Sequence, residues 1–360
     1  DVVMAIGILK ETKVKEYRVA LDDSQVARLV SAGVQVFVES DAGLGVGITD
    51  DNYIDAGATV IGDPEELISV SKVVIKVKEP NIKECKLLQP HQILFCYLHL
   101  AAFPEQTRLL CESGVTAVGF ETVSTSDGQL PLLKPMSQIA GRLAVQNAVH
   151  FLQKHEGGRG VLMSGVGGVE RGRILIIGGG TAGENAASIG VGLGAEVTIF
   201  DRSLERLDYL ADKFGSNLNY VYPTTKAYDE HLSNADIVIG SVLIPGASAP
   251  KLVSRNMVGN MKVGAVVADI AIDQGGCIET SRPTSHDEPT YIVDNVIHYC
   301  VANIPSAVPL TSTKALSNSI SPYVQILAEI ANPIDLVTKN HPLKSGVNIY
   351  NGEVRLDNLQ

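Results

Sequence analysis

Short apolar runs and segments of helical period alternate along the first third of the chain. Runs rich in valine and isoleucine, the pattern of buried strands, occupy residues 4–9, 34–40, 73–77, 93–98 and 115–120. Between them, residues 24–32 and 105–113 carry apolar side chains at helical spacing. Strands that alternate with helices in this way predict a parallel sheet covered by helices.

A second series of apolar runs predicts a second sheet. Its six strands are expected at residues 173–178, 196–200, 219–222, 236–241, 264–270 and 296–301. Six strands fit a complete doubly wound sheet. Two longer segments, residues 137–155 and 309–331, predict helices that join the two series as a hinge.

The two series predict two domains. The stretch after residue 332 is too short for a domain of its own, so we expect it to return to the first sheet. The first domain, expected to bind the substrate, is then discontinuous and comprises residues 1–131 and 309–360. Residues 132–308 form the second, nucleotide-binding domain. The predicted fold class is α/β, with two Rossmann-like doubly wound domains and a cleft between them.

Composition and charge narrow the classes of partner. A hydrophobic content of 45% with 19% charged residues is ordinary for a globular protein. The formal net charge of -11 argues against nucleic acid or an anionic membrane surface, because both require basic patches. No uninterrupted apolar run approaches the length of a membrane-spanning helix. The five cysteines contain no Cys-x-x-Cys pair, so we expect reduced thiols and a cytoplasmic location. The histidines show no metal-ligand spacing, so we expect no metal.

A glycine motif lies between the first strand of the second series and the helix expected to follow it. Gly178 suits a tight turn, Gly180 permits a pyrophosphate to approach the backbone, and Gly183 permits close packing of helix and strand. Asp201 follows Gly183 by eighteen residues and ends the next strand, where a carboxylate accepts hydrogen bonds from the adenosine ribose. This spacing favours NAD over NADP. The neighbouring Arg202 could accommodate the 2′-phosphate of NADP, so some use of NADP stays open. The structural alternative for the glycine motif is a tight turn that binds no ligand.

Polar residues follow several of the predicted strands. Arg18, Lys78 and His99 lie just beyond strands of the first series, and Asp273 lies beyond a strand of the second. Singly, each has a structural alternative as a surface charge, a partly buried histidine or a turn former. Together they supply two cations for a carboxylate, an imidazole for proton transfer and an acid beside the cofactor. Such a set is what a 2-amino or 2-hydroxy acid dehydrogenase requires.

At these residues the chain resembles the L-alanine dehydrogenase family, almost from end to end. The resemblance is carried by the segments Gly7-Ile-Leu-Lys-Glu-Thr-Lys, Arg18-Val-Ala-Leu, Lys76-Val-Lys78-Glu-Pro, Tyr97-Leu-His99-Leu-Ala-Ala, Leu132-Leu-Lys-Pro-Met136-Ser137 and Asp273-Gln-Gly-Gly-Cys-Ile-Glu-Thr-Ser-Arg-Pro-Thr. It implies conversion of L-alanine to pyruvate and ammonium with NAD, in a homo-oligomer that is usually a hexamer. It also implies substrate-binding residues Arg18, Lys78, Tyr97 and Met136, catalytic residues His99 and Asp273, and cofactor-binding residues Ser137, Asp201, Arg206 and Asn303.

Three alternatives stay open at this point. The nucleotide-binding subunit of proton-translocating transhydrogenase shares the fold and a similar N-terminal pattern, but the segment Tyr97-Leu98-His99 belongs to the amino-acid enzyme. A different small amino acid, such as glycine or 2-aminobutyrate, is a second alternative, because the sequence does not give the volume of the pocket. A non-catalytic NAD-binding protein is the third, and retention of all four strand-tip residues speaks against it.

Overall fold

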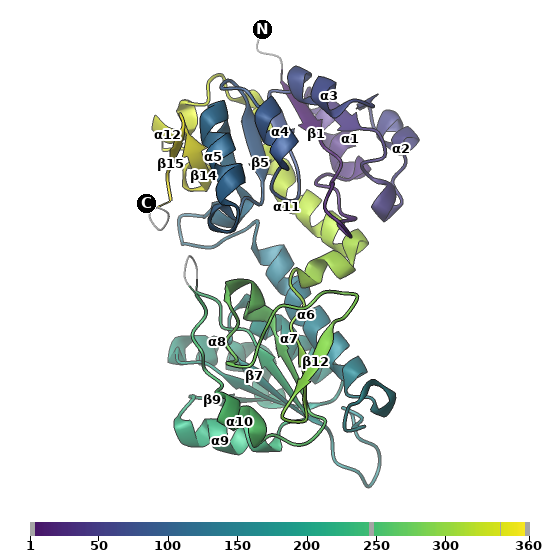
Figure 1. Ribbon diagram of the computed structural model, residues 1–360, viewed down its shortest axis with the longest axis vertical. Coiled ribbons are helices and arrows are strands. Elements are labelled where there is room, and N and C mark those ends of the chain that lie inside the picture. Colours follow the sequence, from purple (N-terminus) through teal and green to yellow (C-terminus); the bar gives the residue numbers. More distant parts are fainter. Residues whose placement is uncertain (1–3, 245–247, 339, 357–360) are drawn as a thin grey trace. The chain divides into compact units, whose positions relative to one another are not determined.

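The computed structural model describes residues 4–244, 248–338 and 340–356, and it divides into two compact units (Figure 1). The first unit comprises residues 1–136 and 308–360, and the second comprises residues 137–307. The outer limits predicted for the first domain, residues 1 and 360, lie outside the described residues. Within the described ranges, no helix combines the length and the apolar character that crossing a bilayer requires.

The first unit is built on a mixed sheet of eight strands among the described residues. Their order across the sheet is β15-β14-β6-β5-β4-β1-β2-β3, and strands β1 to β6 run parallel. The bounds are β1 Ala5–Ile8, β2 Gln35–Glu39, β3 Thr59–Ile61, β4 Val73–Ile75, β5 Ile93–Cys96, β6 Thr116–Gly119, β14 Val347–Tyr350 and β15 Glu353–Val354. Strand β14 pairs antiparallel with β6, so the C-terminal part of the described chain returns to the first sheet.

Helices pack around this sheet and bury apolar side chains. The described helices are α1 Asp23–Ser31, α2 Asp50–Asp55, α3 Pro64–Val70, α4 Ile82–Leu87, α5 Pro104–Ser113, α11 Pro309–Glu329 and α12 Asp335–Thr338. Leu67 of α3, Cys85 of α4 and Leu110 of α5 pack in one core with Val74 and Leu94 of the sheet. Helix α11 packs against α1, where the Arg28 Nη2 donates to Ser321 Oγ at 2.6 Å.

The second unit contains a doubly wound sheet of seven strands among the described residues. Its order is β12-β13-β11-β10-β7-β8-β9, in which all strands but β12 run parallel. The strands are β7 Arg173–Ile177, β8 Glu196–Phe200, β9 Leu218–Val221, β10 Ile237–Gly240, β11 Val266–Asp269, β12 Thr290–Val293 and β13 Val296–Tyr299. The helices are α6 Lys134–Phe151, of which residues 137–151 belong to this unit, α7 Thr181–Gly192, α8 Leu204–Phe214, α9 Thr225–Asn234 and α10 Arg255–Gly259.

The two α/β units confirm the predicted fold class of two Rossmann-like sheets. Four of the described strands were not predicted: β3, β12, β14 and β15. Strand β3 has only three residues, and β12 is an edge strand with half-exposed or exposed side chains, so neither forms the continuous apolar run of a buried parallel strand. Strands β14 and β15 lie in the segment that was expected in the first domain without a predicted element.

Candidate functional site

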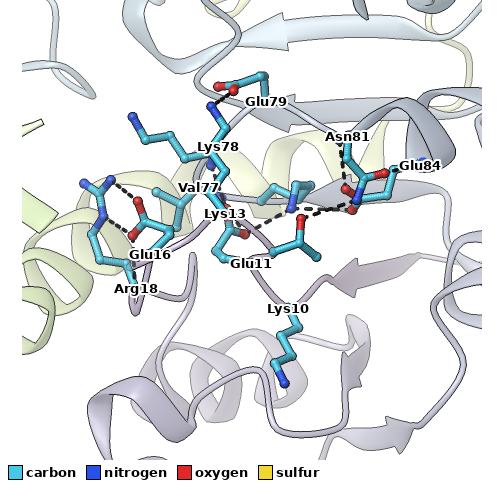
Figure 2. Close-up of polar contacts among 12 residues, drawn as sticks. Lys10, Glu11, Lys13, Glu16, Arg18, Val77, Lys78, Glu79, Asn81 and Glu84 are labelled. Carbon is cyan, nitrogen blue, oxygen red and sulfur yellow. Dashed lines mark hydrogen bonds and ion pairs between the residues drawn. The ribbon is translucent and has the colours of Figure 1, made fainter. Parts of the chain in front are cut away.

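Arg18 lies in the loop after β1 and is buried against Glu16 (Figure 2). Its Nε donates to Glu16 Oε1 at 2.7 Å and its Nη2 donates to Oε2 at 2.8 Å, while both side chains are only 2–3% exposed. The third nitrogen, Nη1, lies 3.4 Å from Met136 Sδ. Glu16 therefore holds one edge of the guanidinium, and the structure brings together two of the predicted substrate-binding residues, Arg18 and Met136.

Glu16 stays ionised in this environment. Burial opposes ionisation of its carboxylate, but the hydrogen bonds and the positive charge of Arg18 outweigh that effect and lower the Glu16 pKa below its usual value. A planar guanidinium paired along two nitrogens is fixed in orientation as well as in position. The pair thus presents Arg18 at a defined angle.

Lys78 follows β4, and its backbone is anchored by Glu11 from the loop after β1 (Figure 2). The parallel register pairs Ile8 with Ile75, so residues three positions further along, Glu11 and Lys78, meet beyond the sheet edge. Glu11 Oε1 accepts the N–H of Lys78 at 2.8 Å, and Oε2 accepts the N–H of Val77 at 3.2 Å. The Lys78 side chain consequently leaves from a backbone that the first strand loop holds in place.

Behind Lys78 lies a buried cluster of charges. The Lys76 Nζ lies 3.4 Å from Glu11 Oε2 and 3.5 Å from Glu84 Oε2, and Lys76 is 1% exposed. Although burial disfavours the charged amine, the two carboxylates raise the Lys76 pKa above its usual value. Burial is the largest effect on Glu11 and raises its pKa. Lys13 and Glu79 form a further ion pair at the edge of this cluster.

His99 and Tyr97 lie just past β5, in the region predicted to carry the acid/base residue. His99 has left-handed backbone angles, φ 46° and ψ 49°, which a residue with a side chain adopts rarely. Glu121, in the 3₁₀ turn Phe120–Thr122 after β6, accepts the N–H of Leu98 at 3.1 Å and that of His99 at 2.9 Å. The Tyr97 and His99 rings stack at 6.2 Å, and the Tyr97 hydroxyl donates to Leu132 O at 2.6 Å.

These contacts show what sequence reasoning missed. Glutamates 11, 16 and 121 hold Lys78, Arg18 and His99, three of the predicted site residues of the first unit, and none of these glutamates was predicted as a site residue. Glu121 follows Gly119 by two residues, as Leu98 follows Cys96, and Gly119 and Cys96 are opposite each other in the parallel register. The register of β5 and β6 is the signal from which Glu121 could have been predicted as a partner of this loop. Glu16, two residues before Arg18, stands in a charged stretch that looks like an exposed loop.

In the second unit, the glycine turn has the geometry of a phosphate-binding loop. Gly178 has φ 102°, and a Cβ at Gly183 would lie within 1.8 Å of the Gly178 carbonyl oxygen, so both positions require glycine. At Gly180, which precedes α7, a Cβ would meet no protein atom within 4 Å. Protein packing therefore does not require glycine at this position, and the open space before the helix N-terminus is compatible with a pyrophosphate close to the backbone. The turn fits a nicotinamide dinucleotide.

Asp201 and Arg206 both contact this turn. Asp201 Oδ2 accepts the Gly179 N–H and Oδ1 accepts the Ser203 N–H, each at 2.8 Å. The Arg206 Nε donates to the Gly179 carbonyl oxygen at 2.5 Å. The structure thus brings Asp201 and Arg206, two of the predicted cofactor-binding residues, to the glycine turn beyond the carboxyl end of β7.

The remaining predicted residues of the second unit lie on separate elements. Asp273 is exposed in the 3₁₀ turn Ile270–Gln274 that follows β11, and Ser137 is in the first turns of α6. Asn303 has a left-handed backbone, φ 59°, and its carbonyl oxygen accepts from Ser306 Oγ at 2.8 Å. That these residues share one cleft with the site residues of the first unit stays a prediction.

The polar network under Asp273 is buried. Asp269, at the end of β11, is 1% exposed and accepts from Ser281 Oγ at 2.6 Å. It also accepts the N–H groups of Ala271 and Ile278, each at 3.1 Å. The loop that carries Asp273 is therefore closed onto one carboxylate. Across the described ranges, no group of three or more His, Cys, Asp or Glu side chains could hold a metal ion.

Comparisons with known proteins agree with the sequence resemblance. The family description "Alanine dehydrogenase/PNT, N-terminal domain" matches residues 7–140, and "Alanine dehydrogenase/PNT, C-terminal domain" matches residues 144–357. Alanine dehydrogenase of Halomonas elongata is 47% identical over 351 residues, 98% of this chain and 94% of its own. That of Methanococcus maripaludis is 48% identical over 354 residues, with the same coverage of both chains.

Solved structures distinguish alanine dehydrogenases from a transhydrogenase. An L-alanine dehydrogenase superposes with a TM-score of 0.93 at 47% identity, covering 97% of this chain and 96% of that one. A transhydrogenase from Sinorhizobium meliloti superposes with a TM-score of 0.81 at 25% identity, covering 97% and 98%. Alanine dehydrogenases are thus favoured over the transhydrogenase as the nearer relatives. The chain belongs to the alanine dehydrogenase/PNT family.

Proposed function

We propose that this chain is an NAD-dependent L-alanine dehydrogenase that interconverts L-alanine and water with pyruvate and ammonium. The observation that carries the proposal is the set of strand-tip residues Arg18, Lys78 and His99, each held at its backbone or guanidinium by a glutamate, in a chain about half identical to alanine dehydrogenases. A protein that only bound a nucleotide would have no use for this arrangement.

The two cations serve to bind the carboxylate of the amino acid. Glu16 occupies the Nε and Nη2 edge of Arg18, which fixes the plane in which the guanidinium meets a further anion. Lys78 adds a second positive charge from a fixed backbone. Two cations define orientation as well as position, and orientation of the substrate Cα is what the reaction needs.

His99 is the proposed acid and base. A bound nicotinamide would supply the acceptor for the hydride of the substrate Cα. His99 removes a proton from the water that adds to this carbon and returns a proton to the departing amine. Asp273 is proposed to orient the water or the amine. The hydrogen bond to Glu121 supports the left-handed backbone of His99.

The second unit is proposed to hold the cofactor. Gly178, Gly180 and Gly183 would receive the pyrophosphate and Asp201 the adenosine ribose, while Ser137, Arg206 and Asn303 complete the contacts by family resemblance. A carboxylate at the end of β8 supports NAD rather than NADP. By the same resemblance we propose a homohexamer in the cytoplasm.

The test is formation of NADH by the purified protein from NAD and L-alanine at mildly alkaline pH, followed by absorbance. D-alanine, L-serine, glycine and NADP are run in parallel as controls. Dependence on both L-alanine and NAD supports the proposal, and activity with glycine or serine would widen the substrate class. Tight binding of NADH without any alanine-dependent turnover would contradict it and favour a nucleotide-exchange role.

A further inference from the structure

Glu184 lies in the first turn of α7, directly after the last glycine of the phosphate-binding turn. Its Oε2 accepts from Arg206 Nη2 at 2.8 Å. Its Oε1 accepts from Lys213 Nζ at 2.7 Å and from the Tyr209 hydroxyl at 3.1 Å. The residue is 9% exposed, so one nearly buried carboxylate holds two cations of α8.

This carboxylate is ionised. Burial opposes ionisation, but the hydrogen bonds from Lys213 and Tyr209, together with the charges of Arg206 and Lys213, lower the Glu184 pKa below its usual value. Glu184 therefore neutralises positive charge beside the glycine turn at physiological pH.

Arg206 is engaged on several sides. Its Nε donates to the Gly179 carbonyl oxygen, its Nη2 donates to Glu184, and its guanidinium carbon lies 4.5 Å from the centre of the Tyr209 ring. Gly179 also donates its N–H to Asp201. Gly179 thus binds Asp201 directly and is linked to Glu184 through Arg206, at the end of the turn where the ribose of a dinucleotide is expected.

NADP differs from NAD by a phosphate on this ribose. Enzymes that accept the phosphate place an arginine beside it, because the group brings additional negative charge. In this chain Arg206 contacts the glycine turn through the Gly179 carbonyl oxygen, and Arg206 and Lys213, both on α8, are paired with Glu184. The same carboxylate adds to the negative charge of Asp201.

We propose that Glu184 is a specificity-determining residue that favours NAD over NADP, because it holds Arg206 and Lys213 in ion pairs beside the adenosine ribose site. The inference rests on the proposed function for its cofactor, and it assigns the discrimination to a residue outside the glycine motif and Asp201. The ion pairs keep the cations from binding the 2′-phosphate of NADP, and the carboxylates repel that phosphate.

The experiment measures binding of NADH and NADPH by calorimetry to the full chain, to Glu184→Gln and to Glu205→Gln. Glu205 is an exposed acid in the first turn of α8 and serves as the matched control for loss of one negative charge. In Glu184→Gln the ratio of the NADPH to the NADH dissociation constant should fall about tenfold, the size expected when the phosphate receives one new charge-assisted hydrogen bond. Glu205→Gln should leave this ratio within about twofold.

A second variant identifies the group that receives the phosphate. Adding Arg206→Met to Glu184→Gln should remove most of the improvement in NADPH binding. Equal weakening of NADH and NADPH in Glu184→Gln would mean that Glu184 only joins α7 to α8, and it would overturn the proposal. If Glu184→Gln does not fold, Glu184→Asp retracts the carboxylate by one methylene and should give a smaller improvement in the same direction, whereas no improvement overturns the proposal.

Binding is measured without turnover, so this result does not depend on the alanine reaction. A chain that binds NADH but does not oxidise alanine would contradict the proposed activity and leave the Glu184 ratio testable. A chain that already binds NADPH as tightly as NADH would overturn the proposal for Glu184 directly.

Discussion

Replacement of Glu11 by glutamine should destabilise the first unit strongly. The substitution keeps the size of the side chain and removes its charge. Lys76 is 1% exposed and then retains one carboxylate partner, Glu84 at 3.5 Å. The amide also presents an N–H₂ group toward one of the two backbone N–H donors, Val77 or Lys78, that Glu11 now accepts. Both changes leave buried polar groups without proper partners.

The magnitude follows from these two losses. Removal of one partner from a buried ion pair costs about 3–5 kcal/mol, and the remaining Glu84 places this case near the lower end. A backbone N–H left without an acceptor adds about 1–3 kcal/mol. Because burial raises the Glu11 pKa, the neutral amide avoids part of the cost of burying a carboxylate, so we expect a total of about 4 kcal/mol. For a unit of this size the melting temperature should fall by about 8–16 °C.

Urea and thermal unfolding, followed by circular dichroism, provide the measurement. Glu112→Gln is the control, because Glu112 pairs with Arg108 at 2.6 Å on an exposed helix face where both side chains are 57–59% exposed. Such a pair contributes no more than about 1 kcal/mol. A double variant with Lys76→Met should be less destabilised than the two single variants combined. If Glu11→Gln costs no more than Glu112→Gln, the reasoning about the buried cluster is wrong.

Three further predictions concern the site. Glu121→Ala removes the acceptor of the His99 N–H, so kcat should fall about tenfold or more while NADH binding is retained. An unchanged kcat in steady-state kinetics would show that the left-handed backbone of His99 does not depend on Glu121. Lys78→Ala should raise the KM for L-alanine and lower kcat together, whereas a change in stability alone would make Lys78 structural. The lowered pKa of Glu16 means that its stabilising effect is present above pH about 4.5 and is lost as the pH falls through the folded-state pKa. Unfolding measured at pH 7 and pH 4 should therefore show a smaller acid-induced loss in Glu16→Gln than in the parent chain.

Buried parallel strands were predictable because they leave continuous apolar runs. Strands β4, β7 and β10 are buried along nearly their whole length, and their sequences show it directly. Strand β12 lies at a sheet edge with exposed positions, so its apolar pattern is broken. Short and edge strands depend on pairing partners that lie elsewhere in the chain, which a local pattern cannot contain.

The candidate site divides in the same way. Lys78 and His99 were proposed because each follows an apolar run by a few residues, and Arg18 because it lies in the loop after the first run. Their glutamate partners could not be predicted in this way, because Glu121 is 22 positions from His99 in the sequence and meets it only through the register of β5 and β6. A glutamate in a polar loop has the same local signature whether it lies in solvent or under a histidine.

The antiparallel pairing of β14 with β6 has a consequence for synthesis on the ribosome. Strand β6 ends at Gly119, and its partner β14 begins at Val347, so the whole second unit is translated between them. The second unit is a continuous stretch and can fold as it emerges. The first unit must wait with an open sheet edge and without the α11 that packs on α1. A chain truncated after residue 307 and released from the ribosome should therefore protect the second unit from protease while the first unit stays sensitive.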